Sequence, residues 1–392
     1  SNAGAKRARG NEDIKDRSKR SKDQGHADAV FGDLPIAMKV KQEKDADAME
    51  EESTADDKKG VDTTAVRPFY GFGMSHKGKK PYQQDQRVLV PQFKVKPKNE
   101  AVPAPRCAFF GVYDGHAGDY CSRFLADTLH LKLGNELTRY LSNTDMNPIE
   151  QLQRSLLQAY LKTDKELMTQ IYNEKPPIPK DGSCATTALI HNQTCWIANV
   201  GDSKAVLGRR HSKDMKKIRA IRLTTDHSPM ILSERKRIEG YYGYVDAEGR
   251  IMGQLGVSRS FGDYKTKKFG VIAQPSLTKF SIMPVDEFLI IASDGLWDVF
   301  APEEAVTFVH QYLQMEQCKR ASVALGELTK RTSPEDKDRA DPNKAYSYAY
   351  KVPESSEIAA QDVAGAVKAL TEEAVLIRAG KDNTTVIIVL FG

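Results

Sequence analysis

The sequence of 392 residues lacks the long apolar runs and the strong charge excess that mark several protein classes. No segment approaches the roughly 18 consecutive apolar residues of a membrane span, and no apolar signal-peptide core stands near residue 1. The net charge of +5 is small for this length, which argues against a dedicated nucleic-acid binder. We therefore expect no membrane span and no nucleic-acid partner.

Cysteine is scarce and shows no paired spacing. The chain has five cysteines, an odd number, and none forms a C-x-x-C pair. Several stand in apolar, strand-like runs, where a thiol behaves as a small hydrophobic side chain. This usage fits a reducing, intracellular location, cytoplasmic or nuclear, better than a disulfide scaffold.

Composition divides the chain into a charged tail and a globular domain. Residues 1–65 carry a basic half and then an acidic half, with too little apolar surface to offset chain entropy, so we expect disorder there. The basic half is either an import or anionic-surface patch or simply a solvated charge run. Residues 66–392 form the predicted domain. Within it, residues from about 319 to 357 are polar and contain proline, which predicts a surface insertion with a short helix near 321–328.

Five apolar runs in the domain predict strands at 106–113, 195–200, 204–208, 287–293 and 385–391. Only Gly201, Asp202 and Ser203 separate the second run from the third, which predicts a tight hairpin. Apolar residues at three- and four-residue steps predict a core-facing helix that begins with Pro148. Further helices are predicted after His116, from Pro302 towards Leu313, and at 358–379.

Aspartate residues stand at the ends of these predicted strands: Asp114, Asp202, Asp294, Asp298 and Asp382. A single such acid, as in Asp114-Gly115, is an ordinary turn signal. If the acids converge on one rim, their repulsion calls for a hard divalent cation such as Mg²⁺ or Mn²⁺. Two such ions about 3.5–4 Å apart can activate a bridging water. From the residues alone, a converging metal site and scattered turn acids both remain open.

His116 is a candidate proton donor because it stands two residues after Asp114. Hydrolysis of a phosphate ester needs an acid on the leaving oxygen, and imidazole titrates in the suitable range. The alternative is a histidine that makes only local hydrogen bonds near the start of a helix.

Seven motifs resemble, in the same order, those of the PPM (PP2C-type) metal-dependent protein serine/threonine phosphatases: VYDGHAG, TTALI, NVGDSKAVL, LTTDHSP, LGVSRSFGD, IIASDGLWDV and KDNTTVIIV. The match covers about residues 66–318 and 358–392. The resemblance implies an α+β fold, an αββα sandwich of two antiparallel sheets flanked by helices. It also implies an enzyme that hydrolyses phosphoserine and phosphothreonine in protein substrates by attack of a water bridging two divalent cations. No phosphoenzyme should form, and we expect a monomer.

The resemblance also implies roles for individual residues. Asp114 resembles the carboxylate that bridges both ions, and the Gly115 carbonyl resembles a further ligand. Asp294 and Asp382 resemble ligands of one ion, and His116 resembles the general acid. A weaker third-ion site is implied by three acids together: Asp202, Asp294 and Asp298.

The first family motif departs from its usual pattern in GKKPYQQDQ. Where the family often has an Arg and then a Glu-Asp pair, this chain has Lys80, Gln84 and Asp85. Asp85 is retained as a metal ligand, whereas Gln84 offers only an amide oxygen. Lys80 would meet the substrate phosphate as a point charge rather than as a planar fork. We expect an active enzyme that binds its metal ions more weakly or has a greater need for Mn²⁺. The alternative is a weak or inactive pseudophosphatase that acts as a binding or regulatory module.

Residues 226 to about 263 resemble the variable flap beside the family's active site. Arg259 and Asp263 in this segment are expected to be structural. Trp297 is expected to pack in the core, because large aromatic residues beside buried strands usually do; the alternative is a surface on which substrate stacks.

Overall fold

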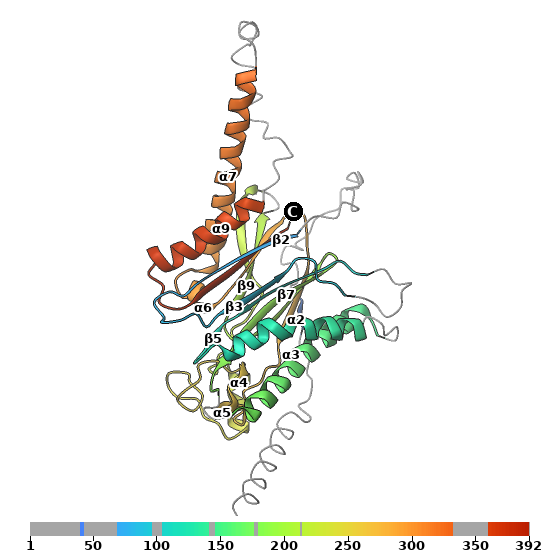
Figure 1. Ribbon diagram of the computed structural model, residues 1–392, viewed down its shortest axis with the longest axis vertical. Coiled ribbons are helices and arrows are strands. Elements are labelled where there is room, and N and C mark those ends of the chain that lie inside the picture. Colours follow the sequence, from blue (N-terminus) through green and yellow to red (C-terminus); the bar gives the residue numbers. More distant parts are fainter. Residues whose placement is uncertain are drawn as a thin grey trace, which may run out of the picture.

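The computed structural model describes residues 40–42, 69–95, 104–140, 146–175, 179–211, 214–331 and 360–391. Two large β-sheets are stacked face to face, and helices cover the outer face of each sheet (Figure 1). The described strand pairs of these sheets are antiparallel, except for one pair at an edge. The predicted αββα sandwich is therefore confirmed.

Two large sheets and one small sheet make up the β-structure, and neighbouring strands pair in the order in which they are named. The six-stranded sheet contains β1 (Val40–Gln42), β12 (Ser276–Ser281), β8 (Thr194–Val200), β7 (Ala185–His191), β4 (Cys107–Tyr113) and β3 (Gln86–Val90). The five-stranded sheet contains β10 (Asp214–Arg222), β9 (Lys204–His211), β13 (Asp286–Ala292), β14 (Thr384–Phe391) and β2 (Phe69–His76). A small third sheet contains β11 (Phe261–Gly262), β6 (Gly182–Ser183) and β5 (Gly115–His116).

The helices fall into three groups. The six-stranded sheet is covered by α2 (Tyr120–Tyr140) and α3 (Pro148–Asn173). The five-stranded sheet is covered by α7 (Pro302–Arg331) and α9 (Ala360–Glu372), and the π-helix η2 (Glu373–Ile377) continues α9. Three short helices accompany the loops: α4 (Leu232–Gly240), α5 (Tyr264–Lys267) and α6 (Asp294–Trp297).

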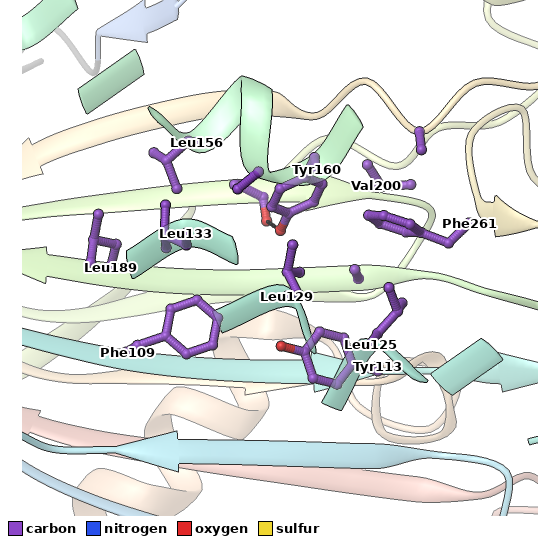
Figure 2. Packing of buried hydrophobic residues seen from close by; sticks show 14 of the residues in the cluster. Phe109, Tyr113, Leu125, Leu129, Leu133, Leu156, Tyr160, Leu189, Val200 and Phe261 are labelled. Atoms are coloured by element: carbon purple, nitrogen blue, oxygen red, sulfur yellow. Dashed lines mark hydrogen bonds between the residues drawn. The ribbon is translucent and has the colours of Figure 1, made fainter. Parts of the chain in front are cut away.

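The strand β4 shows how the sequence builds the layers, because all seven of its residues are buried. Successive side chains of a strand point to opposite faces of the sheet. Phe109 and Tyr113 join the cluster under α2 and α3, whereas Phe110 and Val112 join the cluster between the two sheets. Figure 2 shows Phe109 and Tyr113 in the first of these clusters, with Leu129 of α2 between them. A strand covered on both faces appears in the sequence as a continuous apolar run, as predicted.

The predicted hairpin between 195–200 and 204–208 is wrong. The strand β8 belongs to the six-stranded sheet and β9 to the five-stranded sheet, so the residues between them carry the chain across the sandwich. Gly201 has a φ of 102°, and a Cβ there would lie 2.2 Å from the Cys184 sulfur. Because both strands are buried on both faces, their apolar pattern does not reveal which strands they pair with.

The predicted helix that begins with Pro148 is confirmed as α3. The Asn147 side chain accepts a hydrogen bond of 2.8 Å from the Glu150 backbone N–H, which caps the helix. The other three predicted helices correspond to α2, α7 and α9. Trp297 is 9% exposed within the cluster under α7 and α9, and its Nε1 donates to the Ala292 carbonyl at 2.9 Å. The expectation that Trp297 packs in the core is confirmed.

The helix α7 is longer than the sequence suggested. We predicted a surface insertion at 319–357 with a short helix at 321–328, but α7 continues without a break to Arg331. Residues 319–331 contain no proline and several strong helix formers, and this local preference carries the helix onward. The remainder of the predicted insertion, 332–357, lies outside the described residues.

One strand lies inside the tail that was predicted to be disordered. The strand β1 pairs in parallel with Leu277–Lys279 of β12 and forms an edge of the six-stranded sheet. This pairing uses backbone hydrogen bonds, which amino-acid composition does not report. The other residues of 1–65 lie outside the described residues, so their disorder stays a prediction.

The flap segment predicted at 226–263 has a small core of its own. Ile238 of α4 packs there with Val245, Ile251 and Val257. Arg259 bonds the Glu234 carboxylate and the Gln274 carbonyl, as expected of a structural residue.

Two findings bear on the excluded protein classes. None of the five cysteines forms a disulfide in the structure described, and four of them are buried. Within the described ranges, no helix has the length and apolar character needed to cross a membrane. The intracellular location stays a prediction.

Candidate functional site

Strand direction brings the predicted acids to one rim of the sandwich. The strands β4 and β8 both pair antiparallel with β7, so they run in the same direction and end at the same rim. The chain then crosses to β9, which is antiparallel to β13, so β13 also ends there. Asp114 follows β4, Asp202 follows β8, and Asp294 follows β13 by two residues. One carboxylate oxygen from each of these three residues lies within 4.8 Å of the other two. Of the two alternatives that the sequence left open, convergence is therefore the one that holds for these three acids.

The acids raise one another's pKa values. Burial, and then the neighbouring charges of Asp294, Asp85 and Asp202, raise the pKa of Asp114 well above its usual range. Burial, and then the negative charges of Asp202 and Asp382, raise the pKa of Asp294 to about 7. Ionised carboxylates so close together are unfavourable unless a cation joins them.

Asp85 lies next to this cluster and is buried, with only 2% of its surface exposed. The Ser293 hydroxyl donates to its carboxylate at 2.9 Å, and the Thr385 backbone N–H donates to the same hydroxyl at 2.9 Å. Burial raises the pKa of Asp85 to about 6, although the hydrogen bonds from Thr385 and Ser293 oppose that rise. Ser293 is a supporting residue that the sequence analysis missed.

Asp382 precedes β14, which is antiparallel to β13 and therefore begins at the same rim. Its carboxylate forms an ion pair of 2.9 Å with Lys80. Both side chains are about two-fifths exposed, at 41% and 39%. The hydrogen bond to Asp382 raises the pKa of Lys80, partly offset by desolvation. The structure thus places Lys80 beside a predicted metal ligand.

Asn383 attaches the segment before β3 to the start of β14. Its side-chain oxygen accepts a hydrogen bond of 2.7 Å from the Gln84 backbone N–H. Its amide nitrogen donates to the carbonyls of Lys77 at 2.8 Å and Tyr82 at 3.2 Å. No role was predicted for Asn383 from the sequence. A side-chain amide after an acid at a strand start was the available signal.

Gly115 and Gln84 meet through their backbones. A Cβ on Gly115 would lie 2.4 Å from the Gln84 carbonyl oxygen, so a larger residue does not fit there. The same carbonyl accepts a hydrogen bond from the Ser122 hydroxyl. Gln84 is buried beside the rim, but metal coordination by its side chain and by the Gly115 carbonyl stays a prediction.

Of the predicted third-ion residues, Asp202 and Asp294 are half-buried and Asp298 is exposed. Asp202 accepts a hydrogen bond from the Cys184 thiol at 3.3 Å. Asp298 is exposed, and its backbone N–H donates to the Asp294 carbonyl at 2.8 Å. Burial raises the pKa of Asp298, and the positive charge of Lys204 opposes that rise. A weaker third site at these acids stays a prediction.

His116 belongs to β5, next to Asp114 and the rim. Its Nε2 lies 2.7 Å from a carboxylate oxygen of Asp263, and its side chain is 31% exposed. Burial by itself lowers the pKa of His116, but the charge and hydrogen bond of Asp263 outweigh it, so the pKa is raised. Asp263 was expected to be only structural, and its contact with the candidate acid was missed.

Comparisons with known proteins agree with these motifs. The model of the protein phosphatase 2C family matches residues 82–337. An integrin-linked kinase-associated serine/threonine phosphatase 2C of Homo sapiens is 36% identical over 248 residues, 63% of this chain and 62% of that protein. The Bos taurus protein of the same name is 34% identical over 258 residues, 66% of this chain and 68% of that protein. The chain thus spans 62% and 68% of the lengths of these two relatives.

Solved structures agree on the fold. The crystal structure of a serine-threonine phosphatase 2C from Toxoplasma gondii has a TM-score of 0.61 at 21% identity, and the match covers 83% of this chain and 96% of that chain. A sex determining protein of C. elegans has a TM-score of 0.55 at 20% identity, with 83% and 65% covered. Both comparisons support the same arrangement of sheets and helices.

Proposed function

This chain belongs to the protein phosphatase 2C family of serine/threonine phosphatases, and on that premise we propose that it hydrolyses phosphoserine and phosphothreonine in proteins. We further propose that it works with two divalent cations, Mg²⁺ or Mn²⁺. The observation that carries the proposal is the cluster of Asp114, Asp202 and Asp294, whose oxygens lie within 4.8 Å of one another.

The donor set fits a hard divalent cation. It offers carboxylate oxygens from a rigid rim, which are the ligands that Mg²⁺ and Mn²⁺ prefer. Burial first, and then the negative charges of neighbouring acids, raise the pKa values of Asp114, Asp85 and Asp294. Asp114, Asp294, Asp382 and Asp85 would hold the ions, which when bound would supply Lewis-acid stabilisation and an activated bridging water.

The residues around these acids have roles that their positions support. Lys80 carries a positive charge at the rim and would hold a phosphate oxygen of the substrate. His116 would protonate the leaving serine or threonine oxygen as the phosphorus–oxygen bond breaks. Because water rather than a side chain attacks phosphorus, the proposal includes no covalent enzyme intermediate.

The test uses two substrates with purified full-length chain. p-Nitrophenyl phosphate and a phosphothreonine peptide are assayed with Mn²⁺ and then with EDTA. The proposal expects turnover with Mn²⁺ that EDTA abolishes. Absence of metal-dependent turnover on both substrates would refute it.

A second candidate is a non-catalytic binding module with the same fold. The observation in its favour is the ion pair between Lys80 and Asp382, in a chain that also has Gln84 in place of an acid. This candidate predicts a folded chain that binds no divalent ion and turns over neither substrate. The chain retains six aspartates at the site, and we therefore prefer the first candidate: Asp85, Asp114, Asp202, Asp294, Asp298 and Asp382.

A further inference from the structure

Three two-residue strands bring distant segments to His116. The strand β5 pairs with β6, and β6 pairs with β11, so His116 lies opposite Gly182, and Gly182 opposite Gly262. Asp263 follows directly in a left-handed backbone conformation with a φ of 50°. Its backbone N–H donates to the Asp181 carbonyl at 3.0 Å. This small sheet sets the distance between Asp263 and the candidate acid.

One carboxylate oxygen of Asp263 has two partners. It lies 2.7 Å from His116 Nε2 and accepts a hydrogen bond of 2.6 Å from the Ser260 hydroxyl. The Asp263 side chain is only 9% exposed. Because an ionised carboxylate can only accept, the proton on this side of the ring belongs to Nε2. The other ring nitrogen, Nδ1, has no hydrogen bond to any residue that the structure describes.

A buried ion pair between α5 and α3 fixes the segment that carries Asp263. Lys267 of α5 lies 2.7 Å from Asp164 of α3, and their side chains are 5% and 1% exposed. Lys267 also donates to the Ser260 carbonyl at 2.7 Å, and the Gly262 backbone N–H donates to Asp164 at 3.1 Å. These contacts fix the backbone at Ser260 and Gly262, the two positions that flank the Asp263 carboxylate in the structure.

Gly182 leaves the space in which His116 and Asp263 meet. A Cβ on Gly182 would lie 2.1 Å from the Asp263 carboxylate oxygen and 2.5 Å from His116 Nε2. A methyl group there would push the two side chains apart, because the three atoms nearest to it belong to Asp263 and His116.

We propose that Asp263 is the positioning residue of the general acid and that Nδ1 of His116 is the atom that donates the proton. This inference rests on the proposed function. As the phosphorus–oxygen bond breaks, its electron pair stays on the leaving oxygen, and the Nδ1 proton moves to that oxygen. The ring becomes neutral, keeps its Nε2–H bond to Asp263, and regains a proton from solvent. Asp263 acts by fixing the ring's orientation.

The experiment compares substrates that differ in their need for an acid. A phosphothreonine peptide has a poor leaving group, whereas p-nitrophenyl phosphate has an activated one. For Asp263→Ala we expect kcat on the peptide to fall about 10²-fold, and kcat on p-nitrophenyl phosphate to fall at least about tenfold less. Asp263→Asn keeps an acceptor oxygen for Nε2–H, so it should recover much of the peptide activity.

Two further variants separate positioning from general damage. Gly182→Ala should reproduce the selective loss of Asp263→Ala, because its methyl group disturbs the same pair. Asp246→Ala is the matched control: this flap aspartate accepts a hydrogen bond from the Arg250 backbone and should show no selective loss. Thermal melting of each variant shows whether it folds. If Asp263→Ala does not fold, the test rests on Gly182→Ala, which should show the selective loss, and on Asp263→Asn, which should retain much of the peptide activity.

His116→Ala distinguishes failure of this inference from failure of the proposed function. If His116→Ala lowers both substrates equally, the general-acid role of His116 is wrong. If His116→Ala is selective but Asp263→Ala and Gly182→Ala lower both substrates equally, the positioning role of Asp263 is overturned. Selective loss in all three variants, absent in Asp246→Ala, supports the inference.

Discussion

The two ends of β13 carry acids in opposite electrostatic surroundings. At its start, Asp286 forms a buried ion pair of 2.6 Å with Arg209, and Glu287 bonds both Arg210 and His310. Just beyond its end, Asp294 lies among other aspartates. One strand therefore joins a rim where acids have cationic side chains to a rim where they crowd together.

The pKa values follow this difference. Burial tends to raise the pKa of Glu287, but its bonds with His310 and Arg210 outweigh burial and lower it. Burial raises the pKa of Asp294 to about 7, and the neighbouring acids add to that rise. An acid that is paired with a cationic side chain of the same chain therefore stabilises the fold. The cluster of acids without enough positive charge is the place where we propose that a cation binds.

The largest expected effect comes from the acid at the centre of the crowded rim. Asp114→Asn should lower kcat/KM on a phosphothreonine peptide by about 10³-fold or more, because it removes one of three carboxylates whose oxygens lie within 4.8 Å of one another. Steady-state kinetics with Mn²⁺ measures this. Activity within about tenfold of the unchanged protein would contradict the proposed role of Asp114.

At the opposite rim, loss of an acid should lower the free energy of unfolding and leave metal binding unchanged. Asp286→Asn breaks the buried ion pair with Arg209, so the free energy of unfolding should fall by about 3–5 kcal/mol. Urea unfolding measures this loss, and calorimetric titration with Mn²⁺ should show unchanged binding. Equal effects of Asp286→Asn and Asp114→Asn on metal binding would remove the distinction between the two rims.

In the metal-free protein, a pH series should reveal the repulsion among the acids of the crowded rim. The pKa values of Asp85 and Asp294 rise from 3.8 to about 6 and about 7 on folding. Their stabilising contribution is therefore present below about pH 4 and is lost as pH rises through 6 and 7. With EDTA, the melting temperature should fall by several degrees between about pH 5 and 8, and Mn²⁺ should restore it at pH 8.

Asp294→Asn is the control for this series, because it removes one of the two titrating acids. Its melting temperature should depend less on pH than that of the unchanged protein. A melting temperature that rises steadily up to pH 8 in EDTA would show that these acids do not repel one another as described.

The smallest expected effect concerns Gln84. Gln84→Glu adds a carboxylate beside the rim, so the Kd for Mn²⁺ should fall roughly tenfold. Calorimetric titration measures this, with Gln83→Glu as the control at the adjacent position. A larger effect at Gln83 than at Gln84 would show that the neighbour faces the ions. An unchanged Kd in both variants would contradict the predicted ligand position.

The sequence predicted the parts of the site that depend on strand ends. Asp114, Asp202 and Asp294 follow apolar runs, and their motifs stand in the family's order, so their convergence was predictable. The pairing partners of β8 and β9 were not, because buried strands look alike whichever sheet they join. Backbone pairing of β1 was equally invisible, because it leaves no mark in composition.

The surroundings of His116 could not be predicted for a different reason. His116 and Asp263 are 147 positions apart and meet through strands of only two residues. Such short pairings have no detectable periodicity. The contact also needs Gly182, whose missing side chain matters only because of what lies against it.

The central claim is that the crowded rim binds divalent ions between its acids. Anomalous scattering from crystals grown with Mn²⁺ tests it most directly. The account predicts two Mn²⁺ ions, with the Asp114 carboxylate between them, and their loss in Asp114→Asn. Crystals without Mn²⁺ at this rim, or with Mn²⁺ that remains in Asp114→Asn, would contradict it.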